Sequence, residues 1–253
     1  MVPEERLQQM NGLNQMVSSF LLVISPAIGA MLIGNNMSFS NIGSIMWIDI
    51  ITFFISLLAL LVIYIPKPRK KMEEKKTFKE DLTEGVSFIK KSGLVPFIFI
   101  FASLFSLTVP LIAFFPILVT AHHSGGASEL AILNALFWIG IMIGVSILMA
   151  LNTSPKIRTI IGSSLIMIIG MIIIATAPND GWIQMYLGTF VMGFAVGIIQ
   201  ITALSILQLV TPEELQGRIS ALIMSSLIPV LLPVMILAGG IIAEIYGVIL
   251  FII

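Results

Sequence analysis

Long apolar stretches alternate with short polar segments along the whole chain. A helix rises about 1.5 Å per residue, so about 20 apolar residues cross the roughly 30 Å hydrocarbon core of a bilayer. Stretches of this kind lie at residues 13–34, 45–65, 94–120, 130–151, 157–177, 182–209 and 219–243. A last apolar run, 248–253, is too short to span and is interpreted as the start of another helix. The pattern predicts an all-α membrane protein with about seven transmembrane helices and part of an eighth.

The composition indicates that lipid, and not water, is the main solvent of this chain. Of its 253 residues, 58% are hydrophobic and only 10% are charged, and the mean hydropathy is +1.09. A soluble domain carries about 25% charged residues. This excludes a soluble enzyme. The balance of 13 basic and 13 acidic residues argues against a nucleic-acid binder, and the lack of cysteine excludes a disulfide-stabilised secreted domain.

The basic residues fall on only one side of the predicted spans. Arg6 precedes the first span, nine Lys and Arg lie between the second and third, Lys156 and Arg158 follow the fourth, and Arg218 follows the sixth. The opposite connections carry only acidic charges. Lys and Arg accumulate in cytoplasmic loops. We therefore expect a multi-pass protein of the plasma membrane with a cytoplasmic N-terminus, in which Lys156, Arg158 and Arg218 are cytoplasmic loop residues that set the topology.

Residues 66–93 form the only long polar segment between two spans. Its second part predicts an amphipathic helix, because Phe78, Leu82, Val86 and Ile89 share one helical face. We expect this helix to lie on the cytoplasmic surface of the membrane. A solvated run of charges is the alternative, and it suits residues 67–76 better.

Two similar stretches precede spans that run from the cytoplasm outward. They are Val2-Pro3-Glu4-Glu5, ahead of the first span, and Thr211-Pro212-Glu213-Glu214, ahead of the seventh. We expect each to open a short cytoplasmic turn. The repeat period is then six helices, which is typical of transporters built from two six-helix halves. In this register the chain holds helices 5 to 12 of such a fold, and the four N-terminal helices are expected outside it. Residues 1–65 end the first half, 66–93 are the linker, and 94–253 are the second half with its last helix incomplete.

With this register, the chain resembles the major facilitator superfamily, and in particular its drug:proton antiporter branch of macrolide-efflux and enterobactin-exporter-like proteins. The resemblance covers essentially the whole chain. The pieces that carry it are Val2-Pro3-Glu4-Glu5-Arg6-Leu7, Ser25-Pro26-Ala27-Ile28-Gly29, Ile48-Asp49-Ile50-Ile51-Thr52-Phe53-Phe54-Ile55-Ser56, Phe78-Lys79-Glu80-Asp81-Leu82-Thr83-Glu84-Gly85 and Leu215-Gln216-Gly217-Arg218. It implies a helical bundle that moves a small molecule across the bilayer, with protons as the coupling ion.

The resemblance also implies a role for the first span, which corresponds to the helix that carries the antiporter motif. Gly12, Ser25, Pro26 and Gly29 fall at motif positions, whereas Leu21 stands where the motif has glycine. Small residues allow close helix contact, and Pro26 removes one backbone hydrogen bond. Both a coupling role and ordinary close packing fit these residues.

Candidates for contact with substrate or protons are few within the spans. Asp49, about one turn inside the outer end of the second span, is the best acidic candidate, although the helix dipole also stabilises an acid at such an N-terminal position. Asn134 and Gln200 carry amides that must find partners in lipid, either on neighbouring helices or in a central cavity. Trp138 could give apolar surface to a large substrate or simply pack. Gly140-x-x-x-Gly144 and Gly193-x-x-x-Gly197 have the spacing of close helix packing and are interpreted as structural.

No motif in the sequence indicates an enzyme, a cofactor or a metal site. There is no P-loop, HExxH motif or Gly-x-Ser-x-Gly elbow, and the adjacent His122 and His123 do not share a helix face. The sequence therefore favours a proton-coupled exporter of drug-like or siderophore-like amphiphilic molecules. Two alternatives stay open, a partial and transport-inactive product of a transporter gene and a membrane scaffold.

Overall fold

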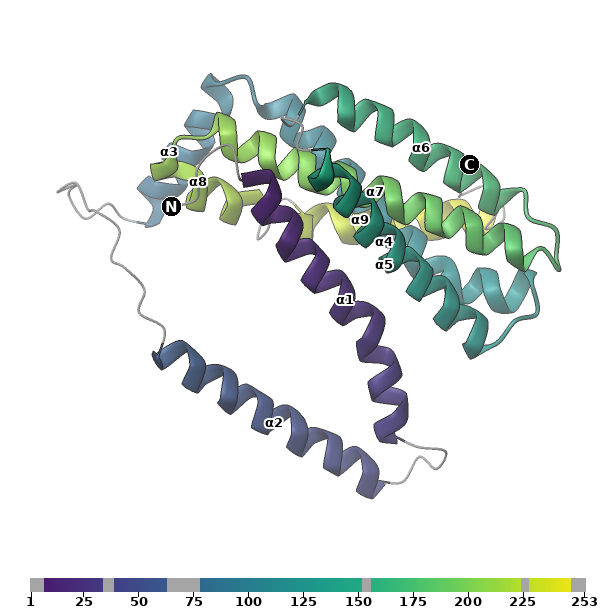
Figure 1. Cartoon of the computed structure of the whole chain (residues 1–253). Helices are drawn as coiled ribbons and strands as arrows, with labels where there is room; N and C mark the ends of the chain where they lie inside the picture. Colours follow the sequence, from purple (N-terminus) through teal and green to yellow (C-terminus); the bar gives the residue numbers. More distant parts are fainter. Residues whose placement is uncertain (1–6, 34–38, 63–77, 152–155, 224–227, 247–253) are drawn as a thin grey trace. The chain divides into compact units, whose positions relative to one another are not determined.

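The computed structural model describes residues 7–33, 39–62, 78–151, 156–223 and 228–246, and this part of the chain is helical apart from short turns (Figure 1). The elements are α1 (Leu7–Ile33), α2 (Phe39–Val62), α3 (Phe78–Lys91), α4 (Val95–Ile117), the π-helix η2 (Leu118–His122), α5 (Ala127–Ala150), α6 (Ile157–Ala175), α7 (Trp182–Val210), α8 (Glu213–Leu222) and α9 (Ile228–Tyr246). The predicted all-α class is confirmed for these residues.

The chain divides into two compact units. The larger unit combines residues 1–23 with 78–253, so the first half of α1 belongs to it, and the smaller unit is residues 24–77. In the larger unit, α7 packs against both α5 and α6, α4 packs against α9, and α3 packs against α8. The core of this unit is centred on α5 and α7, where Phe137, Ile141, Met185 and Met192 are fully buried.

The two faces of α6 show which solvent surrounds the larger unit. Ile160, Met167, Gly170 and Ile174 are buried at helical spacing on one face. Beyond Arg158 in the first turn, the opposite face exposes apolar side chains at the same spacing, namely Ile157, Ile161, Leu165, Ile168 and Ile172. In water such a face would be polar. An exposed stripe of isoleucine and leucine is explained if hydrocarbon covers it.

Three of the described helices are long and apolar enough to cross a membrane. They are Ser128–Ala150, Ile157–Ala175 and Trp182–Val210. The number rises to four if Gly85–Lys91 and Val95–Leu104, between which the chain bends by 109°, count as one broken span. The spans predicted at 130–151, 157–177 and 182–209 are thus confirmed as helices of spanning length. Those predicted at 13–34, 45–65 and 94–120 are helical over α1, α2 and α4 and stay predictions as spans, and residues 248–253 lie outside the described part.

The seventh predicted span is described only in part. The sequence predicts one element over 219–243. In the structure α8 ends at Leu222 and α9 is described from Ile228, and residues 224–227 lie outside the described part, so this span stays a prediction. Pro233 lies inside α9, where it removes one backbone hydrogen bond. The short α8 is the turn that the Thr211-Pro212-Glu213-Glu214 stretch predicts ahead of this span.

The amphipathic helix of the linker is present, and its neighbour is another helix. α3 packs against α8, and Gly85 of α3 lies against Leu222 and Arg218. Ile89 on the same helix is buried, while Lys90 and Lys91 are exposed. Part of the apolar face of α3 therefore rests on α8, where the sequence predicts a membrane surface.

Candidate functional site

Neutral polar side chains join the start of α1 to the last turns of α7. Asn11 Nδ2 donates a hydrogen bond to Gln208 Oε1 at 2.6 Å and a longer one to Ser205 Oγ at 3.4 Å. Gln216 Nε2 of α8 donates to the backbone oxygen of the same Gln208 at 2.9 Å, which fixes the end of α7. We call Asn11, Ser205 and Gln208, together with Gln8, the polar seam.

Gln8 is the unusual member of the polar seam. It precedes Asn11 by three residues on α1, so the two lie on neighbouring positions of one helix face. Its side chain is only 7% exposed, and neither its amide nitrogen nor its amide oxygen has a hydrogen-bond partner among the described residues. A buried amide without a partner destabilises the state that contains it by about 1–3 kcal/mol.

Gly12 allows α1 to approach α5. A side chain at this position would meet Met149 Sδ and would come within 3.2 Å of Val145 Cγ1. One turn further along α1, Ser146 Oγ of α5 lies 3.6 Å from Met16 Sδ. The first half of α1 therefore touches both α5 and α7, and Gly12, predicted from the antiporter motif, lies at the contact with α5.

The two predicted glycine pairs face each other. A side chain at Gly140 or Gly144 would collide with the backbone of Phe190 or Phe194 on α7. A side chain at Gly193 would collide with the carbonyl oxygen of Phe137 on α5, and Gly197 lies against Ile141. These glycines bring the two backbones into direct contact, as the structural interpretation of their spacing predicts.

A second glycine contact joins α6 to α7. A side chain at Gly170 would lie 2.9 Å from the carbonyl oxygen of Gly188, and one at Gly188 would lie at the same distance from the carbonyl oxygen of Gly170. The three helices thus form one unit held by backbone proximity.

The predicted polar and aromatic candidates of the spans have ordinary local surroundings. Asn134 is half-buried, and its Nδ2 donates to the Leu130 backbone oxygen of its own helix at 2.9 Å. Trp138 packs against the core and makes an edge contact with Phe137 at 5.3 Å between ring centroids. Gln200 is half-buried, and its amide makes no hydrogen bond to the part of the chain that the structure describes.

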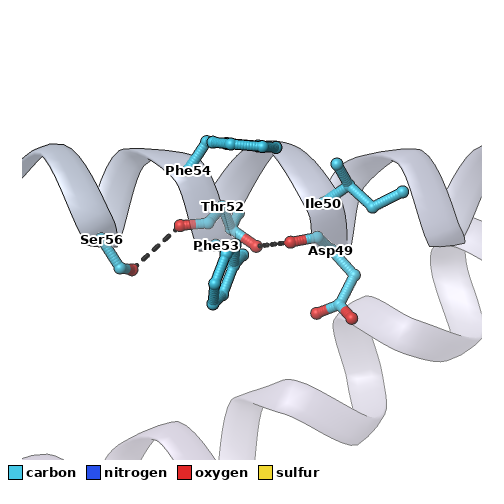
Figure 2. A pocket seen from close by; sticks show the side chains of 6 residues that line it. All are labelled: Asp49, Ile50, Thr52, Phe53, Phe54 and Ser56. Carbon is cyan, nitrogen blue, oxygen red and sulfur yellow. Dashed lines mark hydrogen bonds between the residues drawn. The ribbon is translucent and has the colours of Figure 1, made fainter.

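Asp49 belongs to α2, in the smaller unit, and its side chain is exposed. It lines a shallow open recess on the side of this one helix together with Ile50, Thr52, Phe53, Phe54 and Ser56 (Figure 2). Thr52 Oγ1 donates to the Asp49 backbone oxygen at 2.9 Å, and Ser56 Oγ donates to the Thr52 backbone oxygen at 2.9 Å. These bonds satisfy the hydroxyl groups within the helix and leave the carboxylate outside them.

The remaining predicted residues lie along α1 and at helix ends. Ser25 is exposed on α1, while the surroundings of Pro26 and Gly29 lie outside what the structure describes. Lys156 is the N-cap residue of α6, and both Lys156 and Arg158 are exposed. Arg218 is half-buried on α8, beside Gly85 of α3.

The turn after α4 contains a buried histidine, His123, which the sequence offers only as half of a rejected metal-binding pair. His123 follows η2, is 5% exposed, and its Nδ1 lies 2.8 Å from the Asn179 backbone oxygen. Because a carbonyl oxygen only accepts, Nδ1 carries the proton of this bond. The imidazole ring also contacts the Trp182 ring at 5.4 Å between centroids. His123 therefore connects the turn before α5 to the turn before α7. Among the described residues, no group of metal-binding side chains occurs.

Sequence reasoning misses the polar seam for a specific reason. The first apolar stretch begins at residue 13, so Gln8 and Asn11 count as part of the segment that precedes the membrane. The described helix already includes Leu7, so both residues lie within α1. The available signal was the spacing of Gln8, Asn11 and Gln15 on one face of an otherwise apolar helix.

Comparison with known proteins places the chain in a family. Residues 1–233 match the Major Facilitator Superfamily, a family of membrane transporters and not of enzymes. The chain is 25% identical over 237 residues to macrolide efflux protein A of Enterococcus faecalis, an alignment that covers 91% of this chain and 72% of that protein. It is 24% identical over 252 residues to macrolide efflux protein A of Streptococcus pyogenes.

The second alignment covers 98% of this chain and 61% of the Streptococcus pyogenes protein, so the chain spans less than two thirds of that relative. No solved structure matches the chain significantly. The family match extends over most of the residues, and it agrees with the helical, lipid-facing architecture described above. The chain therefore belongs to the Major Facilitator Superfamily.

Proposed function

We propose that the protein containing this chain is a secondary active transporter that exports amphiphilic drug-like molecules, with macrolides as the first class to test, in exchange for protons. The observation that carries the proposal is the similarity to two macrolide efflux proteins along 91% and 98% of the chain. The similarity is continuous across α1, the linker and α4 to α9, so it does not come from one common helix.

The structure supports a transporter on physical grounds. α5, α6 and α7 are packed backbone against backbone, while α1 meets that unit through side chains, namely the Asn11–Gln208 hydrogen bond and the Met149 side chain that lies against Gly12. A transporter needs both kinds of interface, because alternating access moves one packed half against the other. Within this proposal, Gln200 and Trp138 are candidate substrate contacts, since the Gln200 amide is not engaged by the described residues and Trp138 offers a half-buried aromatic surface.

The proposed orientation follows from the distribution of charge. Lys156 and Arg158, at one end of α6, face the cytoplasm, and Asp180, beyond its other end, faces outward. The N-terminus and the 66–93 segment are then cytoplasmic, and the protein is a multi-pass component of the plasma membrane.

The test is transport by the protein encoded by the complete gene, purified and reconstituted into lipid vesicles. An imposed pH gradient is expected to drive accumulation of a radiolabelled macrolide, and collapse of the gradient with a protonophore is expected to abolish it. A siderophore and a cationic dye are measured in parallel, because the proposal covers amphiphilic molecules as a class.

Two controls separate coupling from leakage. Vesicles without protein report passive entry, and a sodium gradient at constant pH reports a different coupling ion. Failure of the pH gradient to move any of the three compounds would overturn the proposal, whereas uptake driven by sodium alone would overturn only the choice of coupling ion.

A further inference from the structure

We propose that the hydrogen bond between Asn11 and Gln208 is a latch that holds one end of the transport path closed, and that the buried amide of Gln8 opposes it. The proposal rests on the transport function proposed above, because it concerns the change of state that transport requires. It is carried by two features of the polar seam, and by the contrast between the seam and the glycine contacts of α5, α6 and α7.

The glycine contacts form an interface that is suited to staying closed. Gly193 lies against the Phe137 carbonyl oxygen, and Gly144 lies against the Phe194 carbonyl oxygen. Separation of α5 from α7 would break close contacts along both backbones and leave an empty space that no side chain can fill. Packed interfaces of this kind have one favourable arrangement.

The polar seam is suited to opening. Asn11 and Gln208 are neutral amides that meet at 2.6 Å. When two such groups separate into water, each exchanges its protein partner for a water molecule, and the net change in free energy is small. A transport cycle requires that the closed and open states differ by only a few kcal/mol, so that substrate and protons can shift the balance.

In the predicted division of the fold, the contact between Asn11 and Gln208 joins the two halves. α1 belongs to the first predicted half and α7 to the second, so rocking of the halves changes the distance between Asn11 and Gln208. α5, α6 and α7 all belong to the second half and would move together.

The buried amide of Gln8 destabilises the closed state. Its amide is 7% exposed and has no partner among the described residues, although the neighbouring Asn11 amide has two. The buried Gln8 amide loses its bonds to water when the seam closes and regains them when the seam opens. Asn11 therefore favours the closed state and Gln8 disfavours it, so that substitution of the two residues shifts the equilibrium in opposite directions.

The first test measures accessibility of the seam in the complete protein, held in lipid nanodiscs that leave both faces open. This chain has no cysteine, and any cysteine elsewhere in the complete protein is first replaced by serine, so that Ser205→Cys introduces a single thiol at the seam for labelling by N-ethylmaleimide. Asn11→Ala is expected to raise the labelling rate about two- to tenfold, the ratio that corresponds to one net hydrogen bond. Gln8→Leu is expected to lower the rate by about twofold or more, because it removes the unpaired amide.

The matched control is a second buried position on the same helix. Thr189→Cys lies between the glycine contacts of α7 and is fully buried, so its labelling rate should not change with either substitution. General loosening of the fold would raise labelling at both positions. A shift in the same direction with Asn11→Ala and Gln8→Leu, or no shift with either, would overturn the latch.

The second test uses a cross-link and separates the latch from the transport function. In the protein carrying Asn11→Cys and Gln208→Cys, a short bifunctional thiol reagent should stop transport, and cleavage of the reagent should restore it. The control pair, Thr176→Cys with Gln184→Cys, joins α6 to α7 within one half, where Gln184 Nε2 lies 2.9 Å from Thr176 Oγ1, and its cross-link should leave transport unchanged. Normal transport by the cross-linked Asn11 and Gln208 pair would refute the latch while the transport function stands. A wild-type protein that transports nothing would refute the function, and the labelling test would still decide the latch.

Discussion

At the scale of single residues, glycine decides how closely the helices of this protein approach. Gly193 and Gly162 both lie inside apolar helices, yet their surroundings differ completely. The Cβ position of Gly193 is occupied by the Phe137 carbonyl group, whereas a Cβ on Gly162 would meet nothing within 4 Å. The same residue type is therefore a requirement of packing at one position and dispensable at the other.

Substitution of these two glycines by alanine should have opposite effects. Gly193→Ala forces α5 and α7 apart and is expected to destabilise the protein by about 1–3 kcal/mol, as overpacking does. Gly162→Ala adds a methyl group in open space and should leave stability unchanged or raise it by up to about 1 kcal/mol, because alanine favours the helix. Thermal unfolding in detergent or nanodiscs measures both. Equal melting temperatures for the two variants would contradict the glycine contact.

The sequence predicts some residue contacts and misses others for a physical reason. The spacing of Gly140 with Gly144, and of Gly193 with Gly197, marks a face on each helix, so close packing could be predicted from local pattern alone. The pairing of Asn11 with Gln208 joins residues 197 positions apart, and no local pattern relates them. A polar residue in a span signals that it needs a partner, but only the fold shows which one.

At the scale of elements, the junction between α4 and α5 is fixed by one buried ring. The helix widens into η2 just after Pro116, and Thr120 Oγ1 donates to the Pro116 backbone oxygen at 2.8 Å. The next residue after η2 is His123, which bonds to the Asn179 carbonyl group and contacts Trp182. His123 thus connects the turn between α4 and α5 to the turn before α7 and to the first residue of α7.

Removal of the His123 ring should loosen this junction. His123→Ala deletes a buried hydrogen bond and leaves the Asn179 carbonyl group without its donor, which is expected to destabilise the protein by about 1–3 kcal/mol. Asn179→Ala is the control, because the bond uses the backbone oxygen of Asn179 and survives the substitution. The melting temperatures of the two variants test this, and a similar loss in both would show that the bond is not the anchor.

The sequence predicts the long helices of the larger unit and not the local change in helix type after Pro116. The helices α5, α6 and α7 follow from their long apolar runs, because a run of this length in lipid must satisfy its backbone hydrogen bonds within a helix. The π-helix η2 did not follow, because hydropathy measures how apolar a run is and not which backbone hydrogen bonds it makes.

At the scale of the whole molecule, the connections of α6 provide a direct test of orientation. Lys156 precedes the helix and Asp180 follows it, and both side chains are exposed. The surplus of basic residues predicts that Lys156 faces the cytoplasm.

Single cysteines at these two positions should label from opposite sides of an intact cell. A membrane-impermeant maleimide is expected to reach Asp180→Cys from outside and to reach Lys156→Cys only after permeabilisation. Neither position lies in the polar seam or in a glycine contact, so transport serves as a check that the fold is retained. Labelling of Lys156→Cys in intact cells would reverse the proposed topology.

The unequal lengths of α6 and α7 determine where the polar seam lies relative to the bilayer. The two helices meet at Gly170 and Gly188, and from there α6 continues for 13 residues to Ile157, whereas α7 continues for 22 residues to Val210. At about 1.5 Å per residue, α7 overhangs the end of α6 by about 13 Å. The 19 residues of α6 match the hydrocarbon thickness of about 30 Å, so the overhang enters the headgroup layer. Ser205 and Gln208 of α7 then occupy a depth at which water replaces lipid. α1 and α7 can therefore part there without exposing the amides of the polar seam to hydrocarbon.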